Sequence, residues 1–376
     1  GAVGWVAAPV LLDLVNAEPA VHAEALPFLR TMFVGFTGMM LFFMLSGAFR
    51  AAGDPHTPLR LGVALTVLTI AFNLTLIPTL GTVGAAYGTV ASSTIVSAYG
   101  IWRLLQPTSV IHFDRGMDRR PDFAIIRSLF RFGLPTGVQG IAMNVAGVLL
   151  LRFIGSLDQS AEAQAAYAVG YTELFSLITW TSVGLMGASA TVAGQNLGAG
   201  NPDRALAGVR VASQIGLGVA AVVGAMFVLI PRYLLAIFGM TDVRVIDIGE
   251  QLLRYLSVSG FFITVALCYT GALQGTGDTR SPLYISVLSQ IVIPLGLCSL
   301  FQATVGLQPA YIWMAILSGH IARCGLSVAR FKQEKWRDIA VDIEPPKSRL
   351  VTAESEVPGA EPHIPMRDAP EGSRHR

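Results

Sequence analysis

The chain has 376 residues, of which 53% are hydrophobic and only 13% are charged. Because soluble domains average about 25% charged residues, this composition excludes an ordinary soluble protein and predicts helices buried in a membrane. The net charge of +2 gives no reason to expect a nucleic-acid partner, since the basic residues fall in short loops and at segment ends. The cysteines Cys268, Cys298 and Cys324 lie in apolar stretches, so we expect buried thiols without a disulfide or metal site.

Ten apolar segments follow one another along the chain, each close to the ~20 residues that a helix needs to cross the hydrocarbon core. They cover residues 1–15, 28–50, 59–79, 82–105, 129–155, 163–193, 205–230, 250–273, 283–303 and 308–331. Residues 106–128 form the one long connection, which is polar and basic. We therefore expect an all-α polytopic membrane protein with about ten transmembrane helices.

A motif of thirteen residues occurs twice, 224 residues apart. Residues 47–59 read GAFRAAGDPHTPL and residues 271–283 read GALQGTGDTRSPL, with six identical positions. Two like halves around a central site are typical of transporters, because such halves can rock between two open states. The offset predicts two lobes of six helices each. It places the start of the first lobe about 95 residues before Gly1, so we expect its first two helices to be missing.

The repeat and the polar stretches divide the chain into four parts. We expect a partial N-terminal lobe of four helices at 1–105, a cytoplasmic linker at 106–128, a C-terminal lobe of six helices at 129–332 and a disordered tail at 333–376. Lys and Arg are concentrated around both motif copies, in the linker and next to the tail. The positive-inside rule therefore predicts that these parts and the C-terminus are cytoplasmic.

The repeated motif predicts a turn between two helices. Its matching positions are Gly53, Asp54 and Pro58 in the first copy and Gly277, Asp278 and Pro282 in the second. The glycines allow the backbone to leave a helix, and the prolines suit the first turn of the next one. The aspartates are expected to cap that helix or to pair with Arg60 or Arg280. A gate or hinge at the cytoplasmic face is the functional alternative to a simple turn.

Glu173 is the acid that we place deepest in a segment, about ten residues and hence about 15 Å into the helix that starts near residue 163. A carboxylate at that depth costs several kcal/mol unless it is paired, hydrated or protonated, which suits a group that gains and loses a proton. Its helical neighbours Gly170, Ser176 and Thr181 are small or polar, so we expect it to point into the bundle. The alternative is a structural carboxyl group, hydrogen-bonded across the bundle.

Other polar side chains inside the segments are candidates for lining a cavity: Asn73, Gln139, Asn144, Tyr171, Thr181 and Tyr269. A hydrogen bond between helices is the alternative for each of them. Arg152 and Arg323 lie near segment ends, where we expect them to snorkel to the interface, and we place no Lys or Arg inside the membrane.

Several stretches of this sequence resemble those of the multidrug and toxic compound extrusion (MATE) family, and within it the bacterial DinF-like group. The resemblance covers residues 1 to about 332. It rests on both motif copies, on Gly133-Leu134-Pro135, on Ala165-Ala166-Tyr167 and most specifically on residues 192–200, VAGQNLGAG, followed by Ala205. It implies two six-helix lobes around a central cavity, and export of drugs or organic cations in exchange for H⁺ or Na⁺.

The resemblance also implies roles for single residues. Family members often carry a cation-site asparagine in the helix that contains Asn73, and a glutamate at a place similar to that of Glu173. The best-attested coupling acid of the DinF-like group lies on the first helix of the first lobe, which we expect this chain to lack. The corresponding NorM-like pair lies on the first and fourth helices of the second lobe, where this chain has no internal acid.

We therefore predict an H⁺- or Na⁺-coupled antiporter of the inner membrane that exports small amphipathic or cationic compounds. We expect it to be monomeric, without cofactor, metal or nucleic-acid partner. The alternatives are a flippase for lipid-linked saccharides, against which the lack of intramembrane cations counts, and a non-functional fragment. An enzyme is not expected, because each repeated loop holds a single aspartate and no paired acids for Mg²⁺ are evident.

Overall fold

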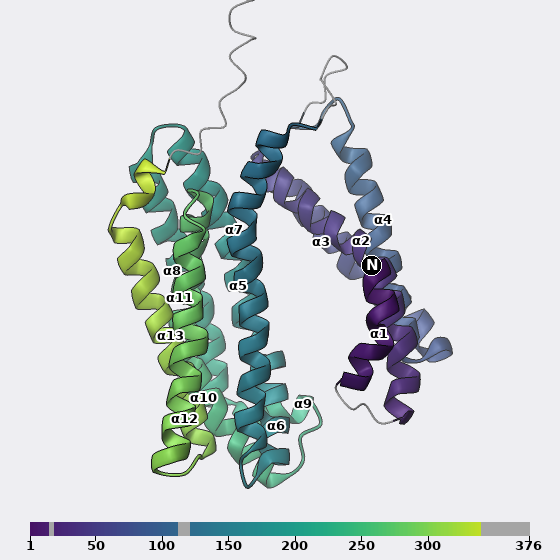
Figure 1. The fold of residues 1–376 in the computed structure, drawn as a ribbon, viewed down its shortest axis with the longest axis vertical. Coiled ribbons are helices and arrows are strands. Elements are labelled where there is room, and N and C mark those ends of the chain that lie inside the picture. The colour runs from purple at the N-terminus through teal and green to yellow at the C-terminus, as the bar shows by residue number, and fades with distance from the viewer. Residues whose placement is uncertain (15–18, 112–120, 340–376) are drawn as a thin grey trace, which may run out of the picture. The chain divides into compact units, whose positions relative to one another are not determined.

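The computed structural model describes residues 1–14, 19–111 and 121–339, and these residues form helices joined by short turns (Figure 1). Residues 112–120 of the predicted linker and 340–376 of the predicted tail lie outside the described residues. The first residues of that tail were wrongly predicted as disordered, because Lys335–Asp338 form a short helix in which Trp336 is buried.

The first group of helices consists of α1 (Ala2–Leu14), α2 (Pro19–Ala51), α3 (His56–Leu80) and α4 (Thr82–Leu104). The second group consists of α5 (Phe123–Gly155), α6 (Ser160–Tyr167), η1 (Ala168–Leu174), α7 (Ser176–Gly198), α8 (Pro202–Leu229), α9 (Pro231–Ile237), α10 (Val243–Gly275), α11 (Arg280–Val287), η2 (Leu288–Val292), α12 (Ile293–Thr304), α13 (Pro309–Lys332) and η3 (Lys335–Asp338). Below, α1–α4 are called the first lobe and α5–α13 the second lobe.

Eight of the described helical stretches are long and apolar enough to cross a membrane. The ten predicted segments all fall on helical stretches, but α1 has only 13 residues and α4 is rich in Gly, Ser and Thr, and neither is among the eight. The all-helical architecture is therefore present, while the predicted number of ten transmembrane helices stays a prediction.

Aspartate caps place two helix starts earlier than we predicted. The Asp122 carboxylate accepts hydrogen bonds from the amides of Ala124 and Ile125 at 2.8 and 3.3 Å, so α5 begins at Phe123 rather than at 129. Asp242 caps α10 in the same way, and that helix begins at Val243 rather than at 250. Hydropathy misses these helix starts because charged residues near them, such as Arg127 in α5 and Asp247 in α10, interrupt the apolar pattern, whereas the cap satisfies amides that the helix leaves unpaired.

Two π-helical insertions interrupt the second lobe. In η1 lie Tyr171 and Glu173, and η2 contains Gln290. Pro294 lies two residues after η2. In an α-helix its ring, which has no N–H, would collide with the carbonyl group of Gln290 four positions earlier, and this explains the local widening. Because π-insertions often occur at functional sites, we expect functional residues beside these two insertions.

Helix α10 is the centre of the second lobe. In its most apolar stretch 72% of the residues are buried, and it packs against α7, α8 and α13. Its Leu252, Leu253 and Leu256 are almost completely buried in the main apolar cluster. Side chains of this size each gain about 1.5–3 kcal/mol when they leave water, so this helix anchors the lobe.

Two glycines of the second motif copy allow α10 to approach α7 closely. A Cβ atom on Gly271 would lie 2.1 Å from the carbonyl oxygen of Met186, and one on Gly275 would lie 2.1 Å from that of Ala190. Gly47, which matches Gly271 in the first copy, has no neighbouring atom within 4 Å. Small residues of this kind are the usual contact points of membrane helices.

Gly271→Ala is expected to lower the free energy of unfolding by about 1–3 kcal/mol, because the added methyl group collides with rigid backbone. Gly47→Ala, the matched control, is expected to be neutral or to stabilise by up to about 1 kcal/mol, since alanine favours a helix and meets nothing there. Unfolding by SDS in detergent micelles, followed by circular dichroism, measures both. Equal effects of the two substitutions would contradict this account of the packing.

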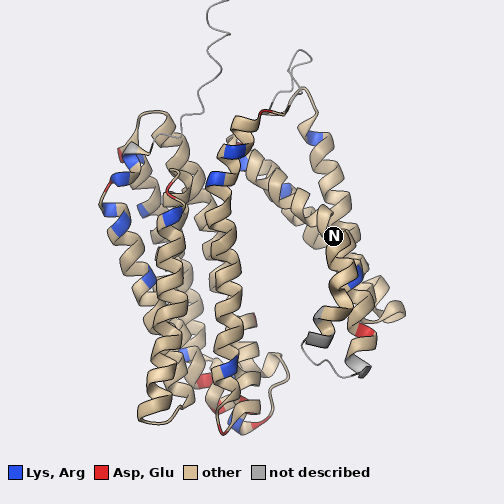
Figure 2. Cartoon of the chain, in the orientation of Figure 1, with Lys and Arg blue, Asp and Glu red and all other residues tan. Residues whose placement is uncertain are grey.

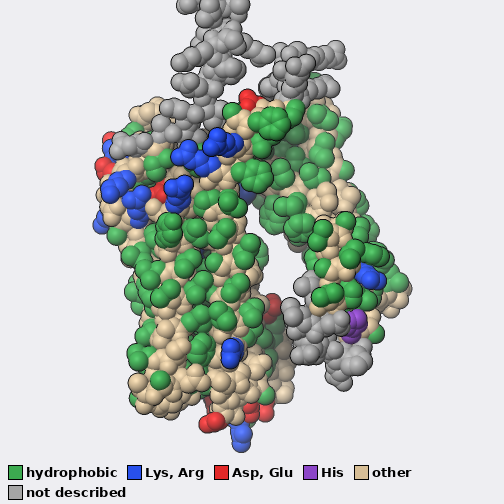
Figure 3. Space-filling view, in the orientation of Figure 1, with side chains coloured by type: hydrophobic (Ala, Val, Ile, Leu, Met, Phe, Trp, Pro, Cys, Tyr) green, Lys and Arg blue, Asp and Glu red, His purple; other side chains and the backbone are tan. Residues whose placement is uncertain are grey.

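Charge is distributed unevenly along the second lobe. Lys and Arg gather at the end where α13 terminates, whereas acidic residues lie at both ends, including the opposite one (Figure 2). There Arg232 pairs with Glu250 at 2.9 Å, and Arg244 lies 4.0 Å from Glu162. Between the two ends the surface seen in Figure 3 is largely hydrophobic. An apolar belt between two charged ends is the pattern expected of a protein that spans a bilayer.

Candidate functional site

Both copies of the repeated motif end a helix in the same way. The amide of Asp54 donates to the Phe49 carbonyl, and the amide of Asp278 donates to the Leu273 carbonyl, each at 2.9 Å. The preceding glycines have positive φ angles, +89° at Gly53 and +94° at Gly277. Hydrogen bonds that span five residues around such a glycine form a Schellman-type helix end, which requires glycine at this position.

Each motif aspartate then caps the helix that follows. Asp54 Oδ1 accepts from the amides of His56 and Thr57, both at 3.0 Å, and Asp278 accepts from the amide and hydroxyl of Ser281 at 3.1 and 2.7 Å. Burial raises the pKa of Asp54, but hydrogen bonds from the Thr57 hydroxyl and from the two amides outweigh it, so the pKa lies below its usual value. The carboxylate therefore stays ionised at neutral pH.

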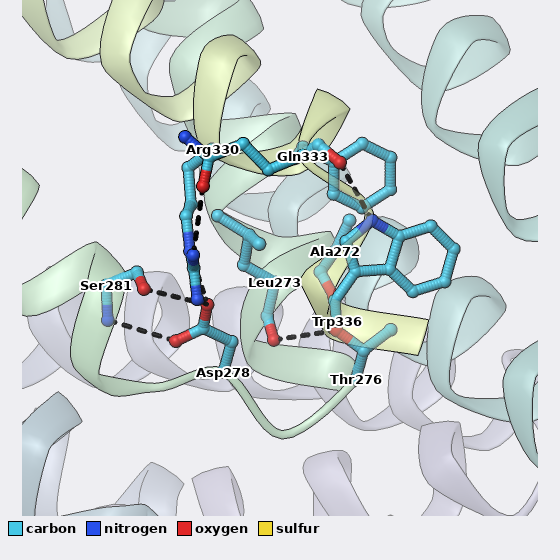
Figure 4. Close-up of polar contacts among 9 residues, drawn as sticks. Ala272, Leu273, Thr276, Asp278, Ser281, Arg330, Gln333 and Trp336 are labelled. Carbon is cyan, nitrogen blue, oxygen red and sulfur yellow. Dashed lines mark hydrogen bonds and ion pairs between the residues drawn. The ribbon is translucent and has the colours of Figure 1, made fainter. Parts of the chain in front are cut away.

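The two aspartates differ in their ionic partner. Arg330, at the end of α13, places Nε and Nη2 at 2.9 and 2.8 Å from Asp278 Oδ2 (Figure 4). We expected the aspartates to cap the next helix or to pair with Arg60 or Arg280. The caps are confirmed, but the ionic partner of Asp278 is Arg330, 52 residues away, which only the fold brings close. In the first lobe the position that matches Arg330 is Gln106, so Asp54 has the cap without the ion pair.

The end of α7 lies between the two motif copies. Gln195 donates through Nε2 to the carbonyl of Ala51 at 2.9 Å, next to the first copy. A Cβ atom on Gly194 would lie 2.7 Å from the carbonyl oxygen of Gly275, in the second copy. The stretch 192–200 therefore contacts both copies through neighbouring residues, and Gly200 ends it with a φ angle of +72°.

A groove of about 490 Å³ runs between α5 and the stretch from α6 to α7. Two of the predicted cavity residues, Asn144 and Tyr171, line it, and Trp180 and Ser176 lie beside them. The ring of Tyr171 stacks on that of Tyr167 with centroids 4.9 Å apart. Aromatic faces next to hydroxyl and amide groups suit an amphipathic cation. Sequence reasoning missed Trp180, although it lies nine residues beyond Tyr171 on the same continuous helical stretch.

The other predicted cavity residues of the second lobe lie elsewhere. Gln139 donates to the Ser286 hydroxyl at 2.7 Å and accepts from Gln274 at 3.1 Å, so it joins three helices inside the lobe. Thr181 donates to the Leu177 carbonyl of its own helix at 2.8 Å. The ring of Tyr269 packs edge-on against Phe331, with centroids 5.3 Å apart. Only Gln139 matches the alternative of a hydrogen bond between helices, because Thr181 bonds within its own helix and Tyr269 makes a ring contact.

Asn73 lies in the first lobe, on α3. A Cβ atom on Gly88 of α4 would be 2.4 Å from the Asn73 Oδ1 atom, so the two helices pack closely at this point. That oxygen is buried and has no hydrogen-bond partner among the described residues. An unpaired buried carbonyl oxygen is a suitable ligand for a hard cation, and it is costly otherwise.

Glu173 lies in η1 with its side chain exposed on the surface of the described chain. The prediction that it points into the bundle was wrong, because its helical neighbours Leu177 and Thr181 are exposed too. The face that packs into the lobe carries larger apolar side chains instead, Leu174 and Ile178, which are 4% and 1% exposed. Small polar neighbours thus mark an open face here, not the helix contact that we expected.

Arg323 also differs from its prediction. It lies on α13 about 21 Å from the start and about 14 Å from the end, at 1.5 Å per residue, and its side chain is only 5% exposed. It does not snorkel to a helix end. Ile312, Ile316 and His320 are buried on the same side of α13, so the helix face that carries Arg323 is turned into the lobe.

Two lobes of apolar helices that share a repeated helix-end motif define a multi-pass membrane transporter. Among the described residues no group of His, Cys, Asp and Glu could hold a metal ion. The family model MatE matches residues 1–75 and 135–300, which is more than half of the sequence. The chain therefore belongs to the MATE family of transporters.

Relatives with similar sequences have names from multidrug resistance. The chain is 26% identical over 341 residues to a probable multidrug resistance protein NorM of Thermotoga maritima, covering 88% of this chain and 72% of that protein. It is 27% identical over 334 residues to the multidrug resistance protein PmpM of Pseudomonas aeruginosa, covering 85% and 68%.

Solved structures share the fold. The outward-facing structure of a multidrug resistance MATE family transporter has a TM-score of 0.81 at 19% identity, over 88% of this chain and 73% of that one. A MOP superfamily transporter from Pyrococcus furiosus has a TM-score of 0.80 at 20% identity, over 88% and 74%.

Proposed function

We propose that this chain is an antiporter that exports drugs or organic cations across the inner membrane by alternating access, driven by a gradient of H⁺ or Na⁺. Its named relatives are multidrug resistance proteins, which supports this substrate class over the lipid-linked saccharide that we considered. The observation that carries the proposal is the groove beside α5, in which Tyr171 and Trp180 offer aromatic faces and Asn144 offers an amide.

Glu173 is our candidate for the coupling residue. It lies two residues from Tyr171, and its backbone carbonyl accepts a hydrogen bond from Ser176, which lines the groove. An exposed carboxylate can be reached by a proton or a cation, and its charge attracts cationic substrates. Asn73 in the first lobe is a second candidate cation ligand, because its side-chain oxygen is buried and unpaired.

The C-terminus is proposed to be cytoplasmic. Arg330 and Lys332 end α13, and they lie at the end of the second lobe where basic residues gather (Figure 2). Basic residues next to a membrane span favour the cytoplasmic side.

Efflux of ethidium from cells that express this chain tests the proposed function. We expect faster loss of dye fluorescence than from cells that carry an empty vector, with the difference abolished by an uncoupler or by removal of sodium. The variant Trp180→Ala is expected to weaken efflux of aromatic cations relative to the unaltered chain, because it removes one aromatic face of the groove. Efflux at the empty-vector rate from cells with membrane-inserted protein would contradict the proposal.

A further inference from the structure

A buried positive charge in the second lobe has no partner. Arg323 is 5% exposed, and none of the ion pairs found among residues 1–14, 19–111 and 121–339 includes it. Its Nε atom is buried without a hydrogen-bond partner. An unpaired charge at this depth in a membrane span costs several kcal/mol, so something that neutralises it is required.

The polar groups around Arg323 are also unpaired. On α13, His320 precedes it by three residues and Ser327 follows it by four, which places all three on one face of the helix. They are 2% and 0% exposed, and the Nδ1 atom of His320 and the hydroxyl of Ser327 have no partner among the described residues. Buried polar groups in folded proteins are nearly always hydrogen-bonded, so three together point to a bound species.

The helices packed against this face add further neutral donors. On η2, Ser289 is fully buried with an unpaired hydroxyl and Gln290 has a buried unpaired amide nitrogen. This π-helical segment touches α13 at Gly319, where a Cβ atom would lie 2.5 Å from the Ser289 carbonyl oxygen and 3.4 Å from the Gln290 amide nitrogen. None of these side chains supplies a negative charge.

The space near these groups is small. A cavity of about 110 Å³, lined by Tyr171, Gln290 and Ile316, lies one helical turn from His320 along α13. Arg323 itself has little accessible surface. Because Arg323 is almost inaccessible, a phosphorylated or organic anion is excluded there, and a species bound at the guanidinium group must be as small as an inorganic ion. Water alone would fill the space but would leave the charge of the guanidinium group unbalanced.

We propose that the interior of the second lobe binds a small monovalent inorganic anion, chloride in a cell, held by the Arg323 guanidinium together with the Ser327 hydroxyl. The anion neutralises the buried charge and accepts the hydrogen bonds that these groups otherwise lack. Its occupancy stabilises the packing of α13 on η1 and η2. The proposal does not depend on which compound the chain exports, and its test requires no transport.

The test compares thermal unfolding of the purified chain in detergent with sodium chloride and with sodium gluconate at equal ionic strength. A thiol-reactive fluorescent dye reports unfolding, because Cys268 and Cys298 are buried in the folded chain. We expect the midpoint temperature to rise with chloride along a saturable one-site curve and not to rise with gluconate. Equal midpoints in both salts would overturn the proposal and would indicate a site filled by water.

Substitutions decide whether Arg323 is the ligand. Arg323→Gln is expected to abolish the chloride dependence, Arg323→Lys to weaken it, and Arg204→Gln, on the exposed start of α8, to leave it unchanged. Should Arg323→Gln fail to fold, the same chloride titration is made on Ser327→Ala, for which we expect a several-fold loss in apparent chloride affinity. An unchanged chloride response in every foldable variant of Arg323 and Ser327 would contradict the proposed site.

Discussion

Asp278→Ala is expected to lower the free energy of unfolding by about 3 kcal/mol, whereas Asp54→Ala at the matching position is expected to lower it by about 1 kcal/mol. Both substitutions remove a helix cap, which accounts for the shared loss. Only Asp278→Ala also leaves a cation without its partner, because Arg330 donates to Asp278 through two nitrogens. Since Arg330 is 25% exposed and keeps some water contact, the expected loss stays at the lower end for a broken buried pair.

The comparison is a matched one, because the two aspartates occupy the same place in a repeated motif. Chemical unfolding in micelles, followed by circular dichroism, gives both values. Arg330→Gln is expected to lose less stability than Asp278→Ala, because it keeps the cap, and the double variant no more than Asp278→Ala alone, since the ion pair is already broken there. Equal losses at Asp54 and Asp278 would show that the ion pair with Arg330 contributes nothing measurable.

Glu173→Gln is expected to reduce gradient-driven transport of a cationic dye by about 5- to 150-fold, the range that coupling free energies of ~1–3 kcal/mol produce. The amide has nearly the same shape as the carboxyl group but can neither release a proton nor neutralise a cation. Glu162→Gln is the matched control, because Glu162 starts the same helical stretch and lies in an ion pair with Arg244 at the lobe end.

Transport measured at several imposed pH and sodium gradients separates coupling from substrate binding. We expect Glu173→Gln to lose the dependence on the gradient, while downhill movement of the dye continues. Glu162→Gln should retain both. A Glu173→Gln variant with unchanged rate and unchanged ion dependence would remove Glu173 from the mechanism, and Asn73 would then be the residue to test.

The membrane-spanning architecture could be predicted because it depends on a strong and local signal. The predicted apolar segments all fall on helical stretches, eight of which are long and apolar enough to cross a membrane, and Gly53 and Gly277 end their helices with positive φ angles. Helix starts were predicted less well. A helix start interrupted by charged residues, such as that of α10, is recognised only by its cap, Asp242, which hydropathy does not register.

The candidate site was harder to predict, because it depends on which face of each helix is packed. Glu173 was expected inside the bundle since its neighbours are small, yet the packed face of that stretch carries Leu174 and Ile178. Arg323 was expected at a helix end, although the spacing of Ile316, His320 and Ser327 already placed it on a buried face. The pair of Asp278 and Arg330 depends on a long-range contact that no local pattern contains.

The central claim, that this chain moves organic cations against a gradient of H⁺ or Na⁺, is tested most directly in proteoliposomes. The purified chain of 376 residues is reconstituted, a pH or sodium gradient is imposed, and uptake of a fluorescent cation is followed. We predict saturable uptake above that of protein-free liposomes, which ceases when the gradient is collapsed. Folded, reconstituted protein that moves no more dye than protein-free liposomes under either gradient would contradict the claim.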